Sequence, residues 1–301
     1  MTKESIVRRI RGSPFLFILP ALIALILIIL YPFAFNIFIS FTNMNVYHIR
    51  NYTLVNPFWR NYSFVFTDPV FDQVVENTFI WTFANVIPTV AIGLVLAFVL
   101  NTKIKGKTIY RLFMIVPWAM PSFITLLIWR GMYNYQYGIV NALLAQLGIS
   151  SVNWLHGNCA TAMFAIVLAN IWLGYPFMMV IFSGALQSIP NELYEVASID
   201  GAVGFNRFRY IVVPMIRPTI LIALLLGSIW TFNNFNSAFL ITQGGPGTCT
   251  SIFITQAYNQ AFTSTFPNYA VAAAYAFIAF IVLLVPGLFW TKASGLTRRT
   301  A

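Results

Sequence analysis

The chain has 301 residues, of which 59% are hydrophobic and only 8% are charged. Soluble domains average about 25% charged residues, so this composition excludes a soluble globular protein. The net charge of +10 does not indicate a nucleic-acid-binding protein, because the basic residues stand between long apolar segments and form no basic face with interleaved aromatics. We therefore expect an all-α polytopic membrane protein.

Six apolar segments are predicted to span the membrane, each near the ~20 residues that a transmembrane helix needs. In chain order they cover residues 14–41, 74–100, 112–129, 161–186, 219–241 and 269–290. The first is predicted to be a retained span, because its charge-free run is too long for a cleaved signal sequence. Residues 1–13 then form an N-terminal tail, 14–291 the transmembrane domain and 292–301 a C-terminal tail.

Lysine and arginine are unequally distributed between the segments that join these spans. Fourteen of the seventeen lie in the two tails, in residues 103–111 and in residues 190–218, whereas only Arg50, Arg60 and Arg130 lie in the alternating segments. Cytoplasmic loops of membrane proteins are enriched in these residues. The sequence therefore predicts a multi-pass protein of the cell (plasma or inner) membrane with both termini in the cytoplasm.

The chain contains two cysteines, Cys159 and Cys249, and two histidines, His48 and His156. These are too few and too far apart for a zinc site or a disulfide framework, so we expect no metal site. Both cysteines fall on or near the predicted outer side. We expect free thiols there, with a disulfide between the two cysteines as the alternative.

No catalytic pattern is present in the sequence. Gly106, Lys107 and Thr108 resemble the end of a phosphate-binding loop, but that pattern requires glycine where Asn101 stands and a preceding strand. The nearby lysines are better explained as anchors of a membrane span. We therefore expect a chain that is not an enzyme and that binds no nucleotide or other cofactor.

The segment 190–218 is unusually long and charged for a link between two spans, with three of the seven acidic residues and three basic ones. Its pattern predicts a helix over 192–200, a turn at Gly201 and a second helix over 202–213 that ends at Pro214. Exposed apolar side chains on a cytoplasmic loop indicate a protein partner. The alternative is an amphipathic helix pair that rests on lipid.

The spacing within this segment is more specific. It reads Glu195-Val-Ala197, three residues, Gly201, nine residues, then Ile211-Val-Val-Pro214. This resembles the EAA motif of binding-protein-dependent ABC importer permeases, with valine at two positions where the motif has alanine and leucine. The resemblance implies a cytoplasmic coupling helix inserted into a groove of an ATPase subunit. The coupling residues would be Glu195, Ala197, Asp200, Gly201, Ile211 and Pro214.

A second resemblance covers most of the third to fifth spans. The stretches Trp172-Leu-Gly174-Tyr-Pro176, Phe232-Asn-Asn234-Phe and Thr242-Gln-Gly244-Gly-Pro246 are similar to the larger permease subunit of maltose-type carbohydrate importers. The resemblance implies ATP-driven, alternating-access import of a di- or oligosaccharide such as maltose, maltodextrin or trehalose. The implied partners are a second permease subunit, two ATPase subunits that hold ATP and Mg²⁺, and an extracytoplasmic sugar-binding protein.

A neutral sugar needs amides, hydroxyls and aromatic faces, and the spans supply these without an ionisable side chain at mid-depth. The match to the maltose-type permeases implies a substrate site at Ser122, Asn170, Gly174, Phe177, Trp230, Thr231 and Asn234. For the polar members the alternative is hydrogen bonding between helices, about 0.6–2 kcal/mol each. Phe177 lacks the hydroxyl of the tyrosine common in this family, and Trp230-Thr231 replaces a Phe-Asn-like pair, so the identity of the sugar stays open.

Two other transport classes are alternatives to this interpretation. A permease for a different solute, such as glycerol phosphate, would favour a basic side chain facing the cavity, and Arg130 is the candidate. An ion-driven secondary transporter would usually place a carboxylate within a span, whereas Glu76 stands only at an edge.

Overall fold

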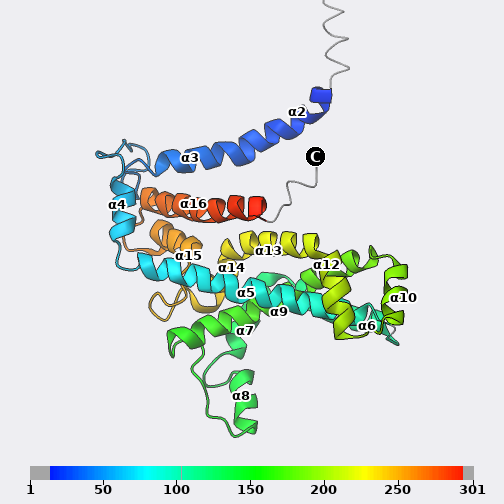
Figure 1. Ribbon diagram of the computed structural model, residues 1–301. Coiled ribbons are helices and arrows are strands. Elements are labelled where there is room, and N and C mark those ends of the chain that lie inside the picture. Colours follow the sequence, from blue (N-terminus) through cyan, green and yellow to red (C-terminus); the bar gives the residue numbers. More distant parts are fainter. Residues whose placement is uncertain (1–13, 103, 294–301) are drawn as a thin grey trace, which may run out of the picture. The chain divides into compact units, whose positions relative to one another are not determined.

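A computed structural model describes residues 14–102 and 104–293 of the chain, and helices joined by loops make up its regular structure (Figure 1). Within these residues the extended structure is limited to one isolated bridge between Thr42 and Leu54. The chain divides into two compact units. Of the described residues, the first unit comprises 14–68 and 257–278, and the second comprises 69–102, 104–256 and 279–293.

In the first unit, α2 (Pro14–Leu25), a π-helical turn η1 (Ile26–Leu30) and α3 (Tyr31–Ile39) follow one another without a break. Apolar side chains along residues 17–35 are exposed on all sides, as expected for a helix that faces lipid. The helix α4 (Arg60–Thr67) is tied to the end of α3, because Asn61 Nδ2 donates hydrogen bonds to the carbonyl oxygens of Ser40 and Thr42, at 2.8 and 2.7 Å. This unit also contains the first half of α16 (Tyr269–Ala293), where Tyr275 Oη donates to Asp68 Oδ2 at 2.8 Å.

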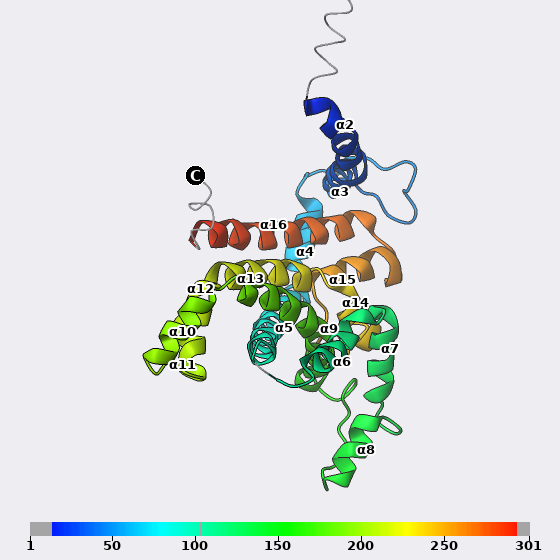
Figure 2. The same ribbon diagram turned by 90° about the vertical axis from the view of Figure 1, so that its right-hand side faces the viewer.

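The second unit is built on α5 (Phe71–Leu100) and α9 (Cys159–Gln187), which pack side by side (Figures 1 and 2). Glycine allows the close approach, since a Cβ added at Gly93 would lie 2.5 Å from Met178 Cβ. A core of buried aliphatic and aromatic residues lines this interface and includes Phe182 and Leu186, at 0% and 1% exposure.

Two predicted spans are broken. The predicted span 112–129 is divided into α6 (Lys107–Ala119) and α7 (Ser122–Met132), which meet at 90°. Pro121 stands at the bend with an extended ψ of 117°, and proline also disfavours helical geometry in Met120 before it. The chain turns sharply here, so the prediction of one continuous helix over this span is wrong.

The predicted span 219–241 is likewise interrupted. The helix α13 (Arg217–Phe232) ends before Asn233, and α14 (Phe235–Thr242) begins after Asn234. The side chain of Asn234 caps α14 by accepting a hydrogen bond from Ser237 N at 3.2 Å. The mean hydropathy of this predicted span does not reveal the cap, because three asparagines lower it only a little.

Four helical segments of the described chain are long and apolar enough to cross a membrane, namely Phe17–Ile39, Phe71–Leu100, Cys159–Gln187 and Tyr269–Lys292. The number is up to six if each of two bent pairs forms one span, Lys107–Ala119 with Ser122–Met132 and Phe205–Met215 with Arg217–Phe232. The predicted all-α fold with six spans agrees with this arrangement. The connecting segments also form helices that the sequence did not predict, α4, α8 (Ile139–Gln146), α15 (Phe253–Tyr258) and η3 (Asn259–Thr263).

Cys159 and Cys249 form a disulfide with their Cα atoms 4.9 Å apart, so the expectation of free thiols is wrong. The fold brings the start of α9 beside the loop after α14. Asn77 of α5 fixes that loop by donating from Nδ2 to the carbonyl oxygens of Thr248 and Ser251, at 3.0 and 3.2 Å. The two cysteines are 90 residues apart in the chain, so only the tertiary structure places them together.

Candidate functional site

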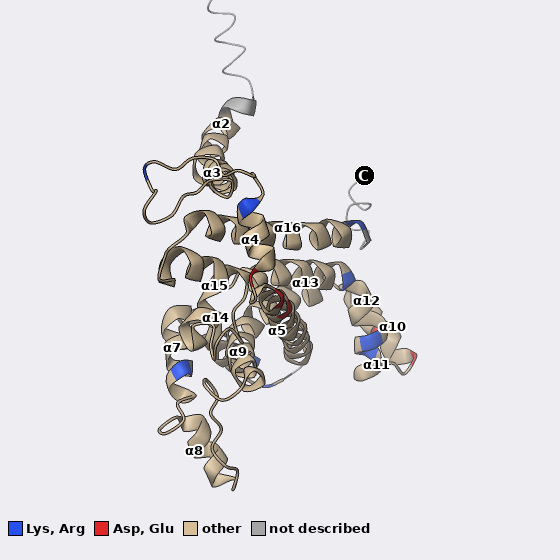
Figure 3. Cartoon of the chain, turned by 90° about the vertical axis from the view of Figure 1, so that its left-hand side faces the viewer, with Lys and Arg blue, Asp and Glu red and all other residues tan. Residues whose placement is uncertain are grey.

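The charged segment 190–218 forms helices at one end of the second unit. They are α10 (Asn191–Ile199), α11 (Phe205–Arg207), a π-helical turn η2 (Phe208–Val212) and α12 (Val213–Met215), which carry charges of both signs (Figure 3). Gly201 has a φ of +76°, a conformation that glycine adopts without strain, and it ends the first helix as predicted. The second helix begins at Phe205 and not at residue 202, because Gly204 also has a positive φ, of +56°. It continues through Pro214 to Met215, beyond its predicted end.

The six predicted coupling residues differ in their exposure. Glu195, Asp200, Gly201 and Pro214 are exposed, whereas Ile211 is half-buried and Ala197 is buried. The same surface presents large apolar side chains to solvent, among them Ile199 at 85% and Phe205 at 69% exposure. A surface of this kind on a small helical loop indicates a protein contact.

Polar and aromatic contacts hold the two halves of this loop together. Arg207 Nη2 donates to Ser198 Oγ at 2.8 Å, and its guanidinium carbon lies 5.7 Å from the centre of the Tyr194 ring. Burial raises the pKa of the Tyr194 hydroxyl, and the positive charge of Arg207 opposes that shift. The rings of Phe208 and Phe98 are 5.0 Å apart, which anchors the loop on the end of α5.

All seven residues predicted for the substrate site line one cavity of about 540 Å³. The breaks in the helices position two of them, since Ser122 begins α7 at the bend and Asn234 stands between α13 and α14. Residues from α9 and α13 supply the others. The remaining lining residues, which the sequence did not single out as site residues, are Thr89, Trp118, Leu126, Leu173, Met178, Gly227, Asn236 and Ser237. None of the lining side chains is charged.

Asn170 is the centre of a hydrogen-bond network behind this cavity. Its Oδ1 accepts from Asn234 Nδ2 and from Ser237 Oγ, both at 2.9 Å, and its Nδ2 donates to Asn85 Oδ1 at 2.9 Å. Asn85 in turn donates to the carbonyl oxygen of Trp81 at 2.7 Å. The network joins α5, α9 and α14, and leaves Asn170 one amide hydrogen for a ligand.

Other polar groups on the lining are free to bind a ligand. Within the described chain, the side chains of Ser122, Thr231, Thr89 and Asn236 have no hydrogen-bond partner. Thr89 lies four residues after Asn85 on the same face of α5, a spacing that was available in the sequence. Gly174 contributes space, since a Cβ there would lie 3.1 Å from Thr89 Cγ2.

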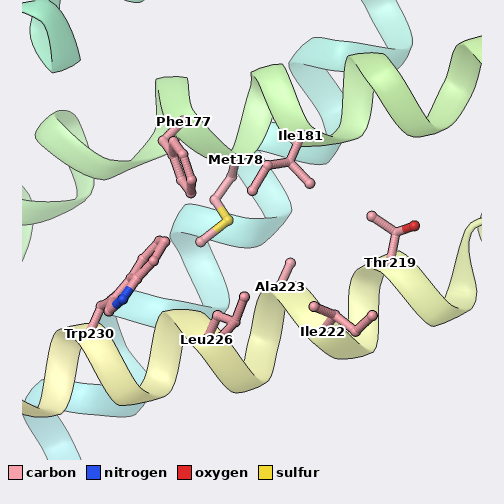
Figure 4. Close-up of a pocket in the computed structure, with 8 residues that line it drawn as sticks. All are labelled: Phe177, Met178, Ile181, Thr219, Ile222, Ala223, Leu226 and Trp230. Carbon is pink, nitrogen blue, oxygen red and sulfur yellow. The ribbon is translucent and has the colours of Figure 1, made fainter. Parts of the chain in front are cut away.

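Aromatic rings form a second side of the cavity. The ring centres of Trp118 and Phe177 are 5.7 Å apart, and those of Phe177 and Trp230 are 5.3 Å apart. Phe177 and Trp230 also line a smaller cavity of about 120 Å³ between α9 and α13, together with Met178, Ile181, Thr219, Ile222, Ala223 and Leu226 (Figure 4). Phe177, Met178 and Trp230 therefore line both a cavity with polar groups and an apolar one.

The chain is similar to known transport proteins over most of its length. The family model described as "binding-protein-dependent transport system inner membrane component" matches residues 89–293. The trehalose/maltose transport system permease protein of Thermococcus litoralis is 35% identical over 270 residues, covering 90% of this chain and 89% of that protein. The maltodextrin transport system permease protein of Bacillus subtilis is 35% identical over 295 residues, covering 91% and 67%.

A solved structure has the same fold. It is the crystal structure of a bacterial ABC transporter involved in the import of the acidic polysaccharide alginate, with a TM-score of 0.81, 20% sequence identity and 99% of both chains covered.

Proposed function

The chain belongs to the family of binding-protein-dependent transport system inner membrane components, and we propose that its cavity carries a neutral sugar across the membrane. It is a permease subunit of an ABC importer of the carbohydrate type, a transport component rather than a catalyst. The cargo is a di- or oligosaccharide such as maltose, maltodextrin or trehalose, the sugars named for the related permeases of Thermococcus litoralis and Bacillus subtilis.

The observation that carries this proposal is the uncharged polar lining of the cavity. Hydroxyl and amide groups without internal partners face a volume of about 540 Å³, within the ~300–1,000 Å³ typical of small-molecule sites. A charged solute such as glycerol phosphate would lose its hydration here without gaining an opposite charge. Arg130, the basic residue considered for that role, does not line the cavity.

The 190–218 loop supports a second part of the proposal. We propose that its exposed apolar and acidic surface inserts into an ATPase subunit, with Glu195, Asp200 and Gly201 at the contact. Two ATPase subunits would hold ATP and Mg²⁺, and a second permease would complete the translocation path. An extracytoplasmic binding protein would deliver the sugar, in line with the description of the family.

Two features support an orientation with the 190–218 loop and both termini in the cytoplasm. Lysine and arginine concentrate in the segments assigned to that side. The disulfide between Cys159 and Cys249 belongs to the opposite set of segments, and disulfides persist in oxidising, extracytoplasmic compartments.

Broken helices beside a central cavity suit an alternating-access mechanism. The bend before Ser122 and the break at Asn234 place polar groups at the cavity, as discontinuous helices do in many transporters. Movement of the coupling loop would be transmitted along α13, because α12 leads into it after Ile216.

The test is the ATPase activity of the purified complex with its ATPase subunits, second permease and binding protein, measured against a panel of neutral sugars and glycerol phosphate. We expect at least one neutral di- or oligosaccharide to stimulate hydrolysis and glycerol phosphate to have no effect. Stimulation by glycerol phosphate alone would contradict the proposal.

A further inference from the structure

We propose that Asn51 is the attachment site of an N-linked oligosaccharide on the outer side of the membrane. The acceptor pattern for this modification is Asn-X-Ser/Thr, in which X is not proline. It occurs twice in the chain, as Asn51-Tyr-Thr53 and Asn61-Tyr-Ser63. Both triplets stand between the first two predicted spans, in a segment that the proposed orientation places outside the cytoplasm. The structure distinguishes them, because the two asparagines have opposite surroundings.

Asn61 is held in the interior of the first unit. Its side chain is only 7% exposed, and its Nδ2 donates to the carbonyl oxygens of Ser40 and Thr42 at 2.8 and 2.7 Å. A glycosylated amide keeps a single hydrogen, so it could make only one of these two bonds. A glycan on Asn61 is therefore incompatible with the contacts that tie α4 to the end of α3.

Asn51 is exposed and lies outside the helices, in the loop that joins α3 to α4 (Figure 1). Among the residues that the structure describes, neither its amide nor the hydroxyl of Thr53 has a hydrogen-bond partner. The nitrogen that would carry the sugar and the hydroxyl of the acceptor pattern are thus both accessible. A surface loop of this kind is where the modification occurs.

Backbone pairing at the base of the loop keeps this triplet at the surface. Asn43 N donates to the carbonyl oxygen of Thr53 at 3.0 Å, and Thr53 N donates to Asn43 Oδ1 at 2.8 Å. Val55 N donates to the carbonyl oxygen of Phe41 at 3.0 Å. These bonds use only the backbone of Thr53, and they leave Asn51 in a bend two residues before the pairing.

The reaction needs a donor and an enzyme from the host. An oligosaccharyltransferase would supply a polyprenyl-linked oligosaccharide as the donor. Asn51 Nδ2 attacks the anomeric carbon of that oligosaccharide and a C–N bond forms, while the bond from this carbon to the phosphate or pyrophosphate oxygen of the carrier breaks. The carrier leaves with the electron pair, and the proton lost by the amide passes to a base of the transferase.

The experiment is glycopeptide mass spectrometry of the chain, purified in its complex from the membranes of the cells that naturally produce it. Trypsin cleaves after Arg50 and Arg60, so peptide 51–60 contains Asn51 and excludes Asn61. The other asparagine of this peptide, Asn56, precedes proline and does not fit the acceptor pattern. We expect peptide 51–60 to carry an oligosaccharide and the peptide that begins at Asn61 to carry none.

Three variants, produced in the same cells, separate the two triplets. Thr53→Ala should abolish the modification, whereas Thr53→Ser, which keeps the acceptor pattern, should retain it. Ser63→Ala is the matched control, because it destroys the second triplet at an exposed position and leaves the hydrogen bonds of Asn61 in place. It should leave the modification unchanged. If Thr53→Ala does not assemble, Asn51→Gln carries the same expectation.

An unmodified peptide 51–60 in the natural chain would overturn the inference, and so would a modification that survives Thr53→Ala or a glycan on Asn61. The inference rests on the proposed orientation and not on the cargo of the cavity. Labelling of Ser150→Cys in intact cells tests that orientation independently. An unmodified Asn51 in a chain with the proposed orientation overturns this inference alone, whereas the reverse orientation would overturn both.

Discussion

At the scale of single residues, Asn170 shows how one side chain serves both structure and binding. Its carbonyl oxygen is fully occupied by Asn234 and Ser237, and its amide donates to Asn85. The two interpretations that the sequence left open, hydrogen bonding between helices and contact with sugar, are therefore compatible at this position. The two interpretations can be distinguished only at residues whose polar groups have no hydrogen-bond partner within the described chain.

Thr231 is such a residue. Its hydroxyl lines the cavity and has no partner among the described residues, so Thr231→Val should remove a ligand hydrogen bond and little else. We expect sugar uptake to fall about three- to tenfold, as expected for one net hydrogen bond, with no change in the melting temperature of the complex.

The matched control for Thr231→Val is Thr125→Val. Thr125 is buried in α7, and its hydroxyl donates to the carbonyl oxygen of Pro121 at 3.2 Å, away from the cavity lining. Uptake by this variant should stay at the unmodified rate. Equal effects of the two substitutions would show that the hydroxyl of Thr231 does not contact sugar.

Unlike Thr231→Val, the substitution Asn170→Leu should affect both sugar uptake and stability. It leaves the amide of Asn234, the hydroxyl of Ser237 and the carbonyl of Asn85 without their partner, at a cost of about 1–3 kcal/mol for each group that stays buried. We expect both sugar uptake and thermal stability of the complex to decrease. An unchanged melting temperature would contradict the role of Asn170 as the centre of the network.

At the scale of elements, the sequence predicted helices better than their interruptions. Apolar length identified every span, because ~20 residues are needed to cross the bilayer. The same averaging concealed the bend before Pro121 and the cap at Asn234, although both residue types are local signals of a helix end. Both interruptions lie at the cavity. There the proline and asparagine indicate a helix end, whereas the mean hydropathy indicates a continuous span.

The substitution Gly201→Ala tests whether the turn in the 190–218 loop is needed for coupling. An added Cβ would meet nothing within 4 Å, so the cost of Gly201→Ala comes from the backbone at φ +76° and is about 1–2 kcal/mol. We expect less sugar transported per ATP hydrolysed by the assembled complex, because the loop no longer keeps its bend.

Gly184→Ala on α9 is the control for the turn. Its Cβ would also meet nothing within 4 Å, but its backbone is helical and accepts alanine. Transport and hydrolysis should remain coupled. If both variants transport the same amount of sugar per ATP hydrolysed, the turn at Gly201 is not needed for coupling.

At the scale of the whole molecule, composition and the apolar pattern were sufficient for the fold class, and the six predicted spans are consistent with the four to six of the described chain. The spatial groupings were harder to predict. Cys159 and Cys249 meet across 90 residues, and Thr89, Trp118 and Asn236 join the cavity from three different segments. No local sequence signal marks these residues, and only the packing of the helices brings them together. The seven residues implied by the resemblance to carbohydrate permeases do line one cavity, because the family from which they were inferred already has this packing.

Orientation can be tested with single cysteines in intact cells. Val203→Cys, in the exposed coupling loop, should react with a membrane-impermeant maleimide only after permeabilisation, whereas Ser150→Cys, between α8 and α9, should react without it. The native cysteines should stay unlabelled until reduced, because they are paired. The reverse pattern of labelling would place the coupling loop outside the cell and contradict the proposed assembly.

Protection of a cysteine within the cavity tests the central claim most directly. Ser122→Cys places an exposed thiol on the lining, and its rate of alkylation in the purified complex can be measured with and without sugar. We expect a transported sugar, delivered by its binding protein, to slow alkylation, whereas glycerol phosphate should have no effect. An alkylation rate that is the same with and without every transported sugar would contradict the assignment of this cavity as the sugar site.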